Sequence, residues 1–87
     1  MVESLVGQKV VVDLNGPFVC LGTLKGFDEQ FLDMRNADFH DLRDTQSSRE
    51  NYIAASAATG IKRNRKRVFV VRREVVALSL LSDVVDE

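Results

Sequence analysis

The sequence predicts a single, mostly β domain over residues 1–87, in which five antiparallel strands bend strongly into a small barrel. A helix at about residues 48–59 is expected between the third and fourth strands. Three observations lead to this prediction. Apolar residues alternate before an Asn-Gly turn, glycines interrupt the next strand, and two apolar segments flank a short turn near the C-terminal end. Alternation indicates half-buried strands, and glycines within a strand mark the bends of small barrels.

The first two strands are predicted to form a hairpin. Alternate positions of Val10–Leu14 are apolar, which is the pattern of a strand with one buried face. Asn15-Gly16 is a strong hairpin signal, because both residues tolerate positive φ. The second strand is expected over Phe18–Phe27. Gly22 and Gly26 lie inside it, so strong curvature is predicted there.

A third strand over about residues 30–42 leads to the predicted helix. The segment Ser47-Ser48-Arg49-Glu50 has the form of a capping box, in which Ser47 accepts from the backbone N–H of Glu50. An alanine-rich stretch follows, and Gly60 supplies the C-terminal stop. The apolar residues of this helix form one narrow stripe, so the helix should lie flat on the barrel surface.

The last two strands are predicted over Val68–Val71 and Val75–Leu81, joined by the short turn Arg72–Glu74. Both strands are continuously apolar, which is typical of strands covered on two faces. A chain of 87 residues lacks the material to cover both faces by itself. The sequence therefore predicts that a neighbouring subunit covers them.

The composition excludes several kinds of site. One cysteine and one histidine cannot build a four-ligand zinc site, and one cysteine cannot form an internal disulfide, so no metal and no cofactor is predicted. Cys20 is interpreted as a small buried hydrophobic residue rather than a reactive thiol. The acids are scattered and His40 has no nucleophile as a partner, so the chain is not expected to be an enzyme. No apolar run reaches the ~20 residues of a membrane span, and a soluble cytoplasmic protein is expected.

Charge is distributed unevenly along the chain, although the net charge is only −1. Residues 1–44 carry a net charge of −4, residues 45–82 carry +6, and the tail residues Asp83, Asp86 and Glu87 carry −3. Five of the six residues in Lys62–Arg67 are basic. This asymmetry fits contact with nucleic acid, and equally a head-to-tail assembly in which unlike faces meet.

The residue order of Val10–Met34 resembles the first motif of the Sm-like (LSm) family, and the likeness extends over nearly the whole chain. Five residues stand in the family's places: Gly16, Gly22, Gly26, Phe27 and Asp28. The resemblance implies a bent five-stranded barrel that forms a homo-oligomeric ring through its fourth and fifth strands. It also implies a ribonucleoprotein role, because members of this family often bind RNA.

The resemblance also implies a base-binding pocket. Phe31 corresponds to the family's stacking aromatic, Asp33 stands where the family has a base-reading Asn, and Arg72 corresponds to the arginine that covers the base. Arg73 replaces the glycine that follows this arginine, and Glu74 stands at the acid or amide position. The spacings from Asn15-Gly16 to Gly22 and from Asp28 to Phe31 are each one residue longer than usual.

The sequence is compatible with two functions. The first is a ring that binds single-stranded RNA weakly and with little base preference, because an ionised Asp33 only accepts hydrogen bonds and repels phosphates. Phe31 would stack on a base, Arg72 and Arg73 would lie beside it, and the basic segment would bind phosphates through Lys62, Arg63, Arg65, Lys66 and Arg67.

The alternative is a ring-forming structural or protein-binding scaffold that binds no RNA. In that case Phe31 belongs to the core, and Asp33 forms an ion pair with Arg72 that orders two turns. The basic segment then docks against acids of the adjacent subunit, namely Asp38, Asp41 and Asp44.

Overall fold

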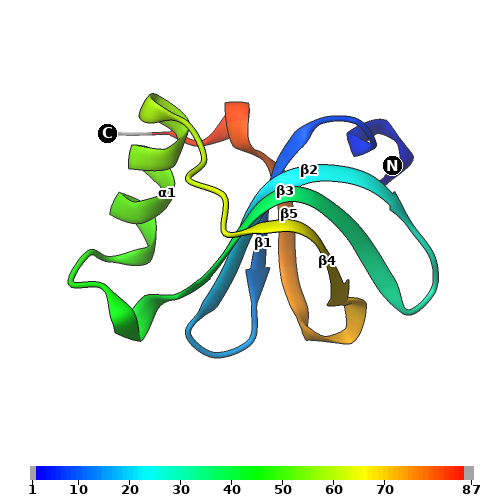
Figure 1. The fold of residues 1–87 in the computed structure, drawn as a ribbon, viewed down its shortest axis with the longest axis horizontal. Helices are drawn as coiled ribbons and strands as arrows, with labels where there is room; N and C mark the ends of the chain where they lie inside the picture. The colour runs from blue at the N-terminus through cyan, green and yellow to red at the C-terminus, as the bar shows by residue number, and fades with distance from the viewer. Residues whose placement is uncertain (1, 86–87) are drawn as a thin grey trace.

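Five strands form one antiparallel sheet in the computed structural model, which describes residues 2–85. The strands are β1 (Lys9–Leu14), β2 (Phe18–Phe27), β3 (Phe31–Asp41), β4 (Arg65–Val71) and β5 (Val75–Leu80), in the order β4-β3-β2-β1-β5 (Figure 1). One α-helix, α1 (Arg49–Thr59), lies between β3 and β4, after a short 3₁₀ helix, Leu42–Asp44. The predicted mostly β fold with an inserted helix is confirmed. The sheet is bent but open, with β4 and β5 as its edges. The tail residues Asp86 and Glu87 lie outside the described residues.

The bend of the sheet is concentrated in β2 and β3. Their pairing register shifts between Leu21 and Thr23 and again between Leu24 and Gly26. At the first shift a Cβ on Gly22 would lie 3.0 Å from the Cα of Ala37 and from the carbonyl oxygen of Arg35. Only glycine fits this close approach of two backbones without a shift. A Cβ on Gly26 would meet nothing within 4 Å.

The bent sheet buries apolar residues on both faces. One cluster lies on the face away from α1 and includes Val10, Val12, Cys20, Leu24 and Met34. A second cluster lies under α1 and consists of Val11, Val19, Leu21, Ile53 and Leu81. The prediction of a β1 with one buried face is therefore wrong, because the inserted helix covers its other face. Cys20 is fully buried, as predicted.

The start of α1 differs from the predicted capping box. Ser48, and not Ser47, is the N-cap, and its hydroxyl accepts from the backbone N–H of Asn51 at 3.1 Å. Ser48 has the extended backbone that an N-cap requires. The helix ends at Gly60, as predicted, where φ is +99°.

Arg49, in the first turn of α1, fixes the helix to the β1–β2 hairpin. Its guanidinium pairs with the Asp13 carboxylate at 3.1 Å and donates to the carbonyl oxygens of Gly16 and Phe18. Figure 1 shows α1 at one end of the molecule, away from the β2–β3 and β4–β5 turns.

The two edge strands expose apolar side chains. Val70 is buried, whereas Phe69 and Val71 on β4 and Val76 on β5 are exposed. The coverage of both faces that the sequence predicts is therefore absent within the described subunit. Among the described residues, no helix is long and apolar enough to cross a membrane.

Candidate nucleic-acid interface

The turn between β2 and β3 is fixed by Asp28. Its carboxylate accepts from the backbone N–H groups of Gln30 at 2.7 Å and Phe31 at 2.8 Å. These two hydrogen bonds hold the pKa of the Asp28 carboxyl below its usual range. The backbone N–H of Arg72 donates to the carbonyl oxygen of Gln30 at 2.8 Å, and Phe31 pairs with Val71. The connection between β4 and β5 therefore lies against this turn.

Phe31 lies at the surface, so its interpretation as a core residue is wrong. Its side chain is 37% exposed, and its ring packs edge-on against Phe69, with the ring centroids 6.3 Å apart. Phe69 is 53% exposed. Two neighbouring aromatic side chains are thus accessible on the outer face of β3 and β4. Exposed aromatic rings are the groups on which unpaired bases stack.

The sequence pattern does not mark Phe69 as a site residue, because this residue lies in an apolar run that predicts burial on both faces. The signal that identifies it is the alternation of Arg65, Arg67, Phe69 and Val71, which places this aromatic on the same exposed face as two arginines.

Arg72 does not lie across Phe31. Its guanidinium donates to the carbonyl oxygen of Asp28 and lies over the ring of Phe27, 5.5 Å from the centroid. Arg73 lines a hollow together with Phe31, Glu29, Gln30 and Val71, and Arg72 does not line it. Of the two arginines, Arg73 is thus the one that shares a hollow with Phe31.

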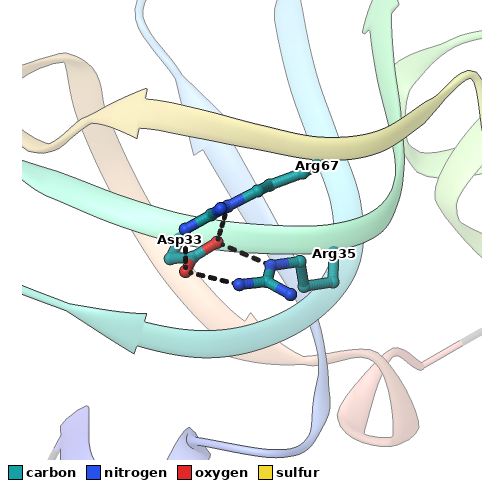
Figure 2. Close-up of polar contacts among 3 residues, drawn as sticks. All are labelled: Asp33, Arg35 and Arg67. Carbon is teal, nitrogen blue, oxygen red and sulfur yellow. Dashed lines mark hydrogen bonds and ion pairs between the residues drawn. The ribbon is translucent and has the colours of Figure 1, made fainter.

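Asp33 forms ion pairs with Arg35 and Arg67, so its predicted pairing with Arg72 is wrong (Figure 2). The cause is the strand register. Arg35 and Arg67 are directly opposite one another on β3 and β4, and Asp33 lies two residues along β3 on the same face. The hydrogen bond from Arg35, supported by that from Arg67, holds the pKa of the Asp33 carboxyl below its usual range. The carboxylate is therefore ionised and largely neutralised by its neighbours.

The basic segment, residues 62–67, does not form a single patch. Arg65 and Arg67 lie on the face of Phe69, while Lys66 alternates to the other side of β4. Arg63 donates to the side-chain oxygen of Asn36 at 2.6 Å. The side chain of Asn64 accepts a hydrogen bond from the backbone N–H of Phe39 and donates one to its carbonyl oxygen. The first half of the segment is thus anchored at Arg63 and Asn64. The basic side chains all remain exposed, namely Lys62, Arg63, Arg65, Lys66 and Arg67.

Two of the three acids expected to dock on this segment are engaged within the subunit. Asp38 is buried and accepts from the hydroxyl of Tyr52. Asp41 pairs with Arg43 at 2.7 Å. Asp38 is therefore not available to an adjacent subunit, which removes part of the charge complementarity that the scaffold alternative requires.

Cys20 and His40 both lie in packed surroundings. Burial raises the pKa of the Cys20 thiol to about 12, so the thiol stays protonated. The ring of His40 stacks on that of Tyr52, with the centroids 4.2 Å apart. Within residues 2–85, no group of three or more His, Cys, Asp or Glu side chains is placed to hold a metal ion.

Comparison with solved structures identifies the fold. No family model matches the sequence, and no curated protein matches it. The Sm protein of Pyrococcus abyssii, solved with a uridine heptamer, is 16% identical, with 91% of this chain and 90% of that chain covered and a TM-score of 0.62. An Sm-like protein of Archaeoglobus fulgidus is 20% identical, with 92% and 88% covered and a TM-score of 0.61.

A chain of the NatC complex, solved with CoA bound, is equally similar. It is 20% identical to this chain, with 92% and 83% of the two chains covered and a TM-score of 0.61. At these identities the likeness shows the fold, and it extends over almost the whole chain.

Proposed function

We propose that this chain, which has the fold of Sm proteins, assembles into a closed homo-oligomeric ring that binds single-stranded RNA. In this ring β4 of one subunit pairs with β5 of the next. The support for the pairing is that β4 and β5 are the two edges of an open sheet and carry the exposed side chains of Phe69, Val71 and Val76. Unpaired apolar edges favour strand addition, and a heterologous contact of this kind closes into a ring when the rotation permits.

The observation that carries the RNA assignment is the exposed aromatic pair Phe31 and Phe69 beside arginines on one face of β3 and β4. The guanidinium of Arg67 lies over the ring of Phe69, 4.6 Å from the centroid. Rings of this kind stack on any base for about 1–3 kcal/mol each, and the basic segment supplies phosphate contacts. The similar fold of the Pyrococcus protein that was solved with a uridine heptamer agrees with this ligand.

The proposed binding is weak and depends mainly on the RNA backbone. Arg35 and Arg67 are both engaged by Asp33, so two of the cations on this face have little free charge to offer phosphates. Contacts from Lys62, Arg63, Arg65 and Lys66 then dominate, and such contacts do not distinguish bases.

A salt titration with matched charge variants tests this proposal. Arg65→Gln with Lys66→Gln should weaken the binding of a fluorescein-labelled RNA heptamer alike for all sequences. It should also reduce the slope of log K against log salt by up to ~1.4, since each phosphate contact on a single strand contributes about 0.7. The control removes two charges elsewhere, by Lys9→Gln with Lys25→Gln, and should leave the slope unchanged. An equal effect of the two double variants would show that only net charge matters and that the basic segment is not a binding site.

The second candidate function is a ring-forming scaffold that binds protein. The observation that favours it is the similar fold of a chain that belongs to the NatC complex. The same titration separates the two functions. A scaffold of this kind shows no RNA binding even at low salt, where phosphate contacts are strongest.

A further inference from the structure

The carboxylate of Asp33 is held twice in the same manner. Arg35 donates from Nε to Oδ1 at 3.0 Å and from Nη2 to Oδ2 at 3.2 Å. Arg67 donates from Nε to Oδ1 at 3.4 Å and from Nη2 to Oδ2 at 3.3 Å (Figure 2). A carboxylate offers about four lone-pair directions, and these two arginines occupy all of them. A further ligand can therefore reach Asp33 only by displacing one arginine.

Arg67 is the arginine that can leave. Both of its hydrogen bonds are longer than those of Arg35, and its side chain is 53% exposed against 35% for Arg35. It is also attached to the edge strand β4, where its guanidinium already rests on the ring of Phe69. Released from Asp33, it stays beside the site as a free cation.

The space beside this carboxylate is an aromatic hollow. A cavity of about 220 Å³ opens between Phe27, Phe31 and Phe69, with Asp33 and the small Gly26 in its wall. The second carboxyl group in the wall, that of Asp28, accepts from two backbone N–H groups of its own turn through the same oxygen, Oδ1. Asp33 instead accepts paired donors through both of its oxygens, so it is the carboxylate on which a planar ligand with two adjacent donors would take the place of one arginine.

A ligand that replaces an arginine on Asp33 must present the same hydrogen-bond donors as that arginine. Each arginine presents two neighbouring, parallel N–H groups to the two carboxylate oxygens. Among the four RNA bases only guanine carries two adjacent donors, N1–H and the 2-amino group, on its pairing edge. Uracil has a single N–H between two carbonyl acceptors, and adenine and cytosine place an acceptor next to the amino group.

We infer that this hollow binds a guanine of single-stranded RNA, whose N1–H and 2-amino groups take the place of Arg67 on Asp33. The ring of the base lies against Phe31 and Phe69, and Arg67 turns to a phosphate. This inference rests on the proposed function, since it names the base at one nucleotide position per subunit. The other nucleotides keep contacts that do not distinguish bases.

The experiment varies the base and leaves the wild-type protein unchanged. Fluorescein-labelled heptamers AAAXAAA, with X as guanosine, inosine, adenosine or uridine, are titrated and followed by fluorescence anisotropy. A bidentate base contact predicts about tenfold tighter binding for guanosine than for adenosine or uridine. Inosine keeps N1–H but lacks the 2-amino group, so it should fall several-fold below guanosine.

Two protein variants locate the effect. Asp33→Asn removes the second acceptor oxygen and should abolish the preference for guanosine over inosine. Asp41→Asn is the matched control, because Asp41 also pairs bidentately with an arginine, Arg43, but does not line the hollow. This control should keep the full preference, and light scattering checks that both variants have the wild-type mass.

The outcomes separate the inference from the proposed function. Equal affinities for all four heptamers, at a measurable level, would overturn the guanine pocket and leave RNA binding in place. A guanosine preference that survives Asp33→Asn would overturn the assignment to Asp33. Absence of binding to every heptamer at low salt would overturn both the pocket and the proposed function.

Discussion

The carboxylate of Asp33, a residue of β3, is paired with one arginine from its own strand and one from β4. Arg35 lies two residues along β3 on the same face, and the pairing of β3 with β4 brings Arg67, directly opposite Arg35, to the same carboxylate. Neither partner follows from the sequence motif, since the resemblance places Arg72 at this pocket. Arg72 is instead engaged by the carbonyl oxygen of Asp28. Strand register, which a motif does not specify, therefore decides the polar chemistry of the candidate site.

The two ion pairs predict a pH-dependent stability. Because the pKa of Asp33 is lowered in the folded state, its ionised form stabilises the fold above the unfolded pKa of ~3.9, and this contribution is lost as the pH falls through the folded value. Asp33→Asn should therefore lower the free energy of unfolding by up to about 1 kcal/mol at pH 7. Urea denaturation at fixed protein concentration should show the difference between the two proteins shrinking as the pH is lowered below ~3.9. A difference that stays constant over this pH range would show that the ion pairs are not its source.

The sequence predicts the strands of the sheet well, but it does not predict where the backbones of two strands approach each other most closely. The bounds of β2 agree with prediction because Asn15-Gly16 sets where the strand begins and Asp28 caps the turn at its end. Gly22 and Gly26 give the same sequence signal, since both interrupt a strand and predict curvature. They differ because the backbone of Ala37 crosses directly over Gly22 alone. Such an approach depends on a residue fifteen positions away along the chain, which local patterns do not encode.

These two glycines form a matched pair for a stability test. Gly22→Ala places a methyl group 3.0 Å from the backbone of Ala37 and Arg35, and should lower the free energy of unfolding by about 1–3 kcal/mol. Gly26→Ala meets open space and should change it little. Thermal unfolding of both variants against the wild type gives the comparison. Equal destabilisation would show that strand propensity, rather than the close approach, sets the requirement for glycine.

The sequence predicts the fold of the whole molecule, and it also predicts an assembly that goes beyond the single subunit. Length and the continuously apolar final strands predict that another subunit is needed, and the structure leaves Phe69, Val71 and Val76 exposed on the two edges. The inserted helix α1 uses Ile53 to cover the outer face of β1 and β2, and Arg49 to fix the hairpin. It thereby covers the second face of β1 and β2 from within the chain. The cover over β4 and β5 is the one assigned to a neighbouring subunit.

Native mass spectrometry of the protein mixed with an RNA heptamer tests the central claim most directly, because one spectrum reports both the number of subunits and the RNA bound to them. A ring closed through β4 and β5 predicts a single oligomeric species whose mass does not grow with protein concentration, and a second species heavier by the mass of bound RNA. A monomer at tens of micromolar, or a ladder of masses that lengthens with concentration, would contradict the ring. A single closed oligomer that carries no RNA at low salt would contradict its proposed function.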